Sequence, residues 1–192
     1  MDYYLVGDGT DGVLVEEFVY GDDHSAVGLC GTIWRPGQRH WQGAASFSRA
    51  LRTDPVLLAR VAPVGRDRAG EVFHRLSGAR LPDEAALRSG YFDYEPFPAV
   101  APLRLGLSDR TYRVLFAKDL TASGAGLSGR LRVGGDVFDW EVRRVGLGIA
   151  WALDVTVELG ADADGNVRLV LSELTEIMRR QGLIPITTER FA

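Results

Sequence analysis

Apolar segments and short polar turns follow one another along the first part of the chain. Three segments rich in aliphatic and aromatic residues are separated by GDGTDG and GDDHS, and Gly and Asp tolerate the tight geometry of turns. The pattern predicts an N-terminal antiparallel β-meander with strands at residues 3–6, 13–20 and 26–34.

The spacing of apolar residues becomes helical after Trp41. Asp54 precedes a proline, so the sequence predicts an N-capped helix over residues 55–61. The apolar positions of the next helix lie three and four residues apart, on one face: Ala69, Val72, Phe73 and Leu76. Gly78 follows where a left-handed residue ends a helix. We expect a further short helix over residues 82–88.

Strands are again predicted first in the second half of the chain, at residues 112–117, 131–133 with 137–142, and 149–159. An amphipathic helix closes this half, and its apolar residues share one face: Val167, Val170, Leu171, Leu174, Ile177 and Met178. Arg179 and Arg180 suit the negative end of its dipole, and Gly182 ends it. The tail at residues 183–187 contains a proline and is expected to form an edge strand.

Three prolines within residues 94–103 divide the chain into two halves, because proline removes backbone donors. We expect a β-meander-plus-helices subdomain at residues 1–95 and a sheet-plus-helix subdomain at residues 103–192. Strands precede helices in each half, so the predicted fold class is α+β: an N-terminal antiparallel β-meander followed by short helices, then a second antiparallel sheet with a C-terminal amphipathic helix.

Composition is that of an ordinary globular chain, with 192 residues, 46% of them hydrophobic, and a net charge of −4. The single cysteine, Cys30, allows no intrachain disulfide. We see no secretory signal and no membrane-spanning run, so we expect a soluble, cytoplasmic protein. Lys118 is the only lysine among 22 basic residues, as a GC-rich bacterial genome would favour. The acidic balance and the lack of a known motif argue against nucleic-acid binding.

The segment GAGLSG, residues 124–129, fits the dinucleotide-binding pattern G-x-G-x-x-G. Such a site needs a buried strand before the glycines and a helix after them, so that helical N–H groups face the pyrophosphate. The following residues alternate as a strand does. We therefore expect a turn between two extended segments and no bound nucleotide or other cofactor.

The segment DADGNVRLVLSE, residues 162–173, resembles a calcium loop in its oxygen positions. Val167 stands where such a loop needs glycine, and the second part already has helical spacing. We expect a turn feeding an N-capped helix, and no metal site.

Catalytic candidates are few. His24 follows two aspartates, which fits either a solvated turn or a general base. Cys30 lies in an apolar strand and is expected to behave as a small hydrophobe, although a Cys–His nucleophile stays open. The chain has neither a G-x-S-x-G nor an S-x-x-K motif.

One segment, TIWRPGQRHWQG, has the composition of a binding hot spot. Five residues form this candidate binding site: Trp34, Arg35, Arg39, His40 and Trp41. The alternative is that the two tryptophans anchor the sheet on the following helices while the arginines are solvated.

The leading functional prediction is a non-catalytic binding protein, an adaptor or immunity-type module that recognises an acidic protein partner or a small anionic ligand. The alternative is a cofactor-independent small-molecule enzyme, of the isomerase or cyclase type, with a pocket between the two halves.

Overall fold

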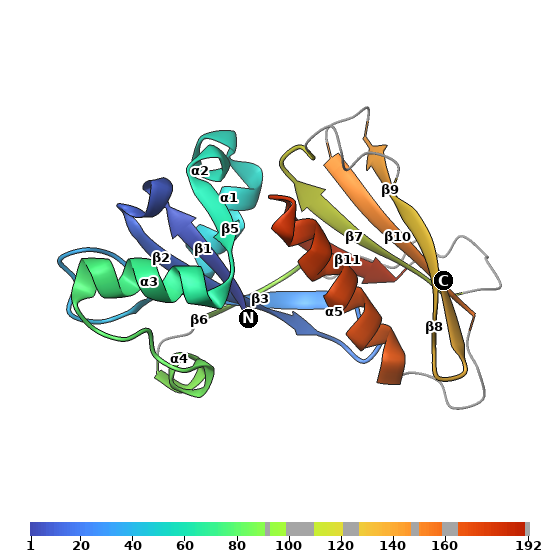
Figure 1. The fold of residues 1–192 in the computed structure, drawn as a ribbon, viewed down its shortest axis with the longest axis horizontal. Coiled ribbons are helices and arrows are strands. Elements are labelled where there is room, and N and C mark those ends of the chain that lie inside the picture. The colour runs from blue at the N-terminus through green and yellow to red at the C-terminus, as the bar shows by residue number, and fades with distance from the viewer. Residues whose placement is uncertain (91–92, 99–109, 121–126, 147–149, 159–164, 191–192) are drawn as a thin grey trace. The chain divides into compact units, whose positions relative to one another are not determined.

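The chain forms two compact units, each with its own antiparallel sheet and helices (Figure 1). Unit 1 comprises Met1–Val19 and Val27–Pro98, and unit 2 comprises Tyr20–Ala26 and Ala99–Ala192. The α+β prediction is confirmed. The structure is a computed structural model that describes residues 1–90, 93–98, 110–120, 127–146, 150–158 and 165–190.

The sheet of unit 1 has the strand order β4-β3-β2-β1-β5, and β6 also pairs with β3. Its strands are β1 (Asp2–Val6), β2 (Gly12–Tyr20), β3 (Ala26–Trp34), β4 (Gln42–Gly43), β5 (Val61–Val64) and β6 (Asp93–Pro96). The predicted meander is therefore present as β1, β2 and β3. Val61 was expected to end a helix, but it begins β5 and pairs with Val6.

The helices of unit 1 are α1 (Ala45–Thr53), α2 (Pro55–Ala59), α3 (Arg66–Ser77) and α4 (Glu84–Gly90), with a short 3-10 helix η1 (Gly7–Gly9). Asp54 caps α2 as predicted, because its carboxylate accepts hydrogen bonds from the N–H groups of Val56 at 2.8 Å and Leu57 at 3.3 Å. Gly78 ends α3 at φ +74°, the left-handed geometry that glycine adopts without cost.

A distant residue caps α1. The Asp93 carboxylate, on β6, accepts hydrogen bonds from the N–H groups of Ala44 and Ala45, both at 2.7 Å. These N–H groups lie at the start of α1, where no intrahelical acceptor is available. One carboxylate thus joins the short strand to the helix.

A buried ion pair lies between the sheet of unit 1 and α1. Glu16 on β2 and Arg52 on α1 have side chains that are 0% and 4% exposed. The guanidinium donates to both carboxylate oxygens, at 3.0 and 2.7 Å, and to the carbonyl of Ser48 at 2.6 Å. Burial lowers the pKa of Arg52, but the charge and hydrogen bonds of Glu16 outweigh it and leave the pKa raised. The Arg52 guanidinium therefore stays charged within the fold.

The sheet of unit 2 has the strand order β11-β7-β10-β9-β8. Its elements are β7 (Arg110–Ala117), β8 (Ser128–Val133), β9 (Asp136–Val145), β10 (Ala150–Glu158), α5 (Gly165–Arg180) and β11 (Ile184–Arg190). The closing helix α5 crosses one face of this sheet (Figure 1) and packs most of its predicted apolar face there, whereas Ile177, expected on the same face, is 45% exposed. The predicted tail strand is present as β11, at one edge of the sheet.

The tip of the β2–β3 hairpin, Tyr20–Ala26, belongs to unit 2. The N–H of Arg190 donates to the Ser25 hydroxyl at 3.0 Å, and the Arg168 guanidinium lies 5.1 Å from the centre of the Tyr20 ring. A segment from the beginning of the sequence therefore completes the second unit. Across the described ranges, no helix has both the length and the apolar surface that spanning a bilayer requires.

Replacing Glu16 by Leu should lower the free energy of unfolding by about 3–5 kcal/mol, because it leaves the buried Arg52 charge without its counter-ion. The double replacement Glu16→Leu with Arg52→Met should cost less than the sum of the single effects. Urea unfolding of the four proteins in this cycle measures the coupling. Additive effects would show that the two side chains do not stabilise each other.

Candidate functional site

The two tryptophans of the predicted binding segment are core residues of unit 1. Trp34 and Trp41 are 5% and 7% exposed, and both contact the ring of Phe73 on α3. Trp34 meets this ring edge-on with centroids 5.0 Å apart, and Trp41 stacks on it at 5.4 Å. The structure thus brings the two indoles together under the surface, where they anchor the sheet on α3.

The polar residues of the same segment lie in a hydrogen-bonded turn. The N–H of Gln38 donates to the Arg35 carbonyl at 3.1 Å, and the Gln38 side-chain carbonyl accepts from the N–H of Arg35 at 3.2 Å. The Arg35 guanidinium lies 5.4 Å from the centre of the Phe47 ring. Arg39 and His40 are exposed. The side chains of Arg39 and His40 therefore lie at the surface of this turn.

A second charged surface lies on the sheet of unit 2, on the face opposite α5. Side chains alternate across a strand, so the residues between the buried positions of β7–β10 share this face. Strand register places Asp154 opposite Arg113 on β7 and opposite Glu141 on β9. We call this surface the outer face, and define it by Arg113, Ser128, Arg130, Arg132, Asp139, Glu141, Arg143, Asp154, Thr156 and Glu158, with Glu189 of the neighbouring edge strand opposite Arg113.

Asp154 lies at the centre of the outer face and is held by two arginines. Arg113 donates to its two oxygens at 2.5 and 2.8 Å, and Arg143 donates to it at 2.8 Å. The Asp154 side chain is only 12% exposed. Burial raises the pKa of this carboxyl, but the hydrogen bonds and charges of Arg113 and then Arg143 outweigh burial and lower it. The carboxylate is therefore a fixed negative charge.

An open pocket of about 500 Å³ lies beside this ion-pair network. Its lining comes from β8, β9 and β10 and consists of Ser128, Gly129, Arg130, Asp139, Trp140, Glu141, Asp154 and Thr156. Arg130 lies 3.6 Å from Asp139, and Arg143 lies 3.4 Å from Glu141. The pocket thus combines hydroxyl, carboxylate and guanidinium groups whose positions depend on strand register.

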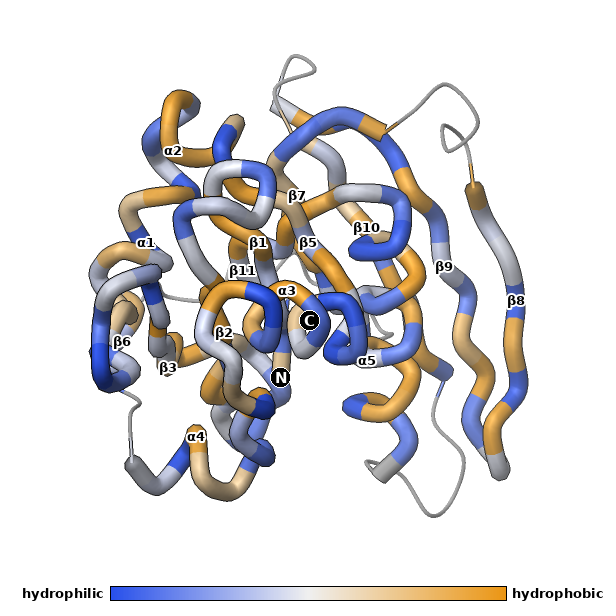
Figure 2. Tube along the Cα trace, turned by 60° about the vertical axis from the view of Figure 1, so that its left-hand side comes forward, coloured by the Kyte–Doolittle hydropathy of each residue, from blue (hydrophilic) through white to orange (hydrophobic). Residues whose placement is uncertain are grey.

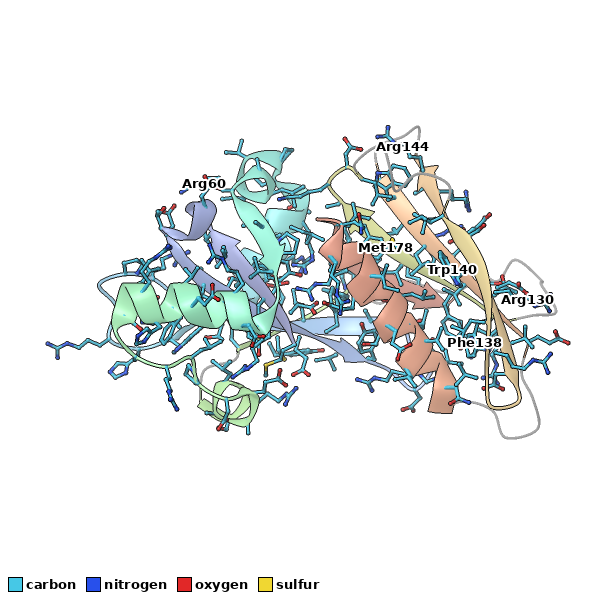
Figure 3. The ribbon with its side chains drawn as sticks, viewed as in Figure 1. Arg60, Arg130, Phe138, Trp140, Arg144 and Met178 are labelled. Atoms are coloured by element: carbon cyan, nitrogen blue, oxygen red, sulfur yellow. The ribbon has the colours of Figure 1, made fainter. Side chains whose placement is uncertain are left out.

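Gly129, the last glycine of the G-x-G-x-x-G pattern, has a packing role. A Cβ at this position would lie 2.8 Å from the ring of Trp140, which pairs with it across β8 and β9. Trp140 and Phe138 belong to the core side of β9 (Figure 3). The residues after the glycines form a strand and no helix, as expected, but this strand begins at Ser128, so Gly129 lies within β8 and not in the predicted turn. Gly124 and Gly126 lie outside the described residues.

Within the described ranges, the remaining candidates form no common site. Residues 162–164 of the calcium-like segment lie outside the described residues, whereas Glu173 is exposed on α5. Among the residues that the structure describes, no three His, Cys, Asp or Glu side chains lie together as metal ligands would. His24 packs its ring edge against Tyr112, with centroids 6.0 Å apart. Burial raises the pKa of the half-buried Cys30 thiol and so disfavours its nucleophilic thiolate.

Sequence reasoning missed the outer face, although its signal is present. Polar residues occupy every second position of FDWEVR and of LDVTVE, the period of a strand with one solvated face. Their pairing depends on register between strands, which a single sequence does not show. No family model, curated protein or solved structure matches the chain.

Replacing Trp41 by Ala should lower the free energy of unfolding by about 3–5 kcal/mol, because it removes a buried ring from the core of unit 1. Arg39→Ala should change it by less than about 0.5 kcal/mol, since that side chain is exposed. Urea unfolding compares the two variants. Equal small effects would contradict the anchoring role of Trp41. In this segment, only Arg39 and His40 can be replaced in binding assays without also removing a buried side chain.

Replacing Asp154 by Asn should make the free energy of unfolding of unit 2 depend less on pH in the acidic range. The folded pKa of Asp154 lies below its unfolded value, so its stabilisation is full above about pH 4 and is lost as the pH falls through the folded pKa. Asp154→Asn should therefore be less stable than the wild type at neutral pH and show a shallower decline in acid. Asp139→Asn, at an exposed position, is the matched control. Unfolding titrations from neutral to acidic pH check this, and equal slopes for wild type and Asp154→Asn would contradict it.

Proposed function

We propose that this chain is a non-catalytic binding protein that recognises an acidic protein partner through the outer face of unit 2. The observation that carries the proposal is the exposure of Arg130 and Arg132 on β8, beside a network in which Arg113 and Arg143 already neutralise the Asp154 carboxylate. Side chains that ion pairs already hold in place lose little conformational entropy when a partner binds. Less of the interaction energy is therefore needed to order them. Complementary charges then select the partner.

The electrostatics of Asp154 suit recognition better than proton transfer. A general acid or base works best when its pKa lies near the working pH, whereas the pKa of Asp154 is lowered and its carboxylate stays ionised. The adjoining pocket is open, while sites for small molecules usually enclose most of the ligand. The alternative of a cofactor-independent enzyme stays a prediction.

The preference for an acidic partner comes from the β8 side of the outer face. The Arg130 side chain is 65% exposed, and Arg132 is exposed on the same strand. Within the described part of the chain, Arg132 has neither an ion pair nor a hydrogen bond from its side chain. Arg39 and His40 are a second proposed contact with the same preference. A cytoplasmic location and the choice between a protein and a small anionic ligand stay predictions.

A displayed library of short random peptides, selected against the immobilised chain, tests the proposal. We expect enrichment of acidic peptides, and loss of their binding when Arg130 and Arg132 are both replaced by Glu. The matched control replaces the exposed Arg80 and Arg180 by Glu, which changes the net charge equally but leaves the outer face intact. Selected peptides that bind both double variants equally well, or no selected peptides at all, would contradict the proposal.

A further inference from the structure

Among the described residues, no further strand pairs with β8 at its edge of the unit-2 sheet. β8 lies at the end of the sheet order and pairs with β9. We propose that β8 binds an extended acidic segment of the partner as an added β-strand. This inference rests on the proposed function, because it specifies how the acidic partner is held.

The hydrogen-bond pattern of β8 shows which backbone groups face the open edge. The N–H of Val142 donates to the Leu127 carbonyl at 2.7 Å. In an antiparallel ladder, residues that bond to the neighbouring strand alternate with residues whose N–H and C=O groups point away from it. Leu127 bonds to β9, so Ser128, Arg130 and Arg132 direct their backbone groups away from β9. Three residues thus offer donors and acceptors to an incoming strand.

The side chains of β8 specify the pattern of the incoming strand. Arg130 and Arg132 are exposed on the outer face, whereas Leu131 and Val133 are half-buried and pack against the core of unit 2. This alternation is visible along β8 in Figure 2. Opposite charges facing each other across neighbouring strands stabilise a sheet. The complementary segment therefore has acidic residues on one side and apolar residues on the other.

A second copy of this chain fits the edge poorly. An antiparallel β8–β8 pair centred on Leu131 would place Arg130 of one copy opposite Arg132 of the other. Like charges directly opposite destabilise a pair of strands. Charge complementarity thus favours a foreign acidic strand over self-association.

Other strand edges are protected in ways that β8 is not. At the opposite edge of the same sheet, β11 contains Pro185 and an irregularity between Pro185 and Thr187. In unit 1, β5 contains Pro63 and β4 has only two residues. Proline, bulges and short strands are the usual means of blocking edge pairing. In β8 all six residues retain their N–H groups.

A fluorescein-labelled peptide, Thr-Val-Glu-Val-Glu-Val-Thr, tests the inference by fluorescence anisotropy on the full chain. The control peptide has Lys in place of Glu. We expect binding of the Glu peptide only. Arg132→Pro should weaken it at least about tenfold more than Arg132→Gln, because Pro also removes the N–H that faces the edge. The ladder to β9 does not use this N–H, and a melting curve checks that the variant folds.

Amide hydrogen exchange on the wild-type chain gives a readout that needs no variant. The Glu peptide should slow exchange at the N–H groups of Arg130 and Arg132, which face the edge, while Leu131 is protected by β9 from the start. If the peptide binds without this protection, and Arg132→Pro equals Arg132→Gln, strand addition is wrong and the proposed function stands. If no acidic peptide binds, both are wrong.

Discussion

The pairing of Asp154 with Arg113 and Arg143 makes an ordered outer face possible. With α5 covering one face of the unit-2 sheet, the other face must carry polar side chains. A carboxylate that is only 12% exposed stays charged there only if cations meet it. β10 lies between β7 and β9, so it receives one arginine from each side. The central position of the strand thus determines both the stability and the geometry of the surface.

The fold was largely predictable where its cause is local. The strands β1–β3, the Asp54 cap of α2 and the left-handed Gly78 follow from neighbouring residues, and the structure confirms them. Features with distant causes were not predictable. The cap of α1 comes from Asp93, on a strand 48 residues later in the sequence, and β5 exists because Val61–Val64 pairs with β1. Such contacts require the tertiary fold.

The difference between local and distant causes also applies to the predicted binding segment and to the outer face. Composition marked Trp34 and Trp41 as candidates, but their burial depends on Phe73, which belongs to a helix later in the sequence. The charges of the outer face lie on neighbouring strands, and they meet only through register. Gly129 shows the reverse case, because the ring of Trp140 explains the one glycine of the nucleotide-like motif that the structure describes.

The arginines of β8 act in opposite ways on different partners. Charged residues on an edge strand normally prevent aggregation, because a second copy brings the same charge to the same place. That repulsion weakens or vanishes when the incoming strand is acidic, and it becomes attraction when acids face Arg130 and Arg132. Specificity is a difference between two affinities. Here Arg130 and Arg132 lower the affinity for a second copy of the chain and raise the affinity for an acidic strand. The backbone groups of β8 can therefore remain available to a partner, because the charges of Arg130 and Arg132 prevent pairing with a second copy without a proline or a bulge.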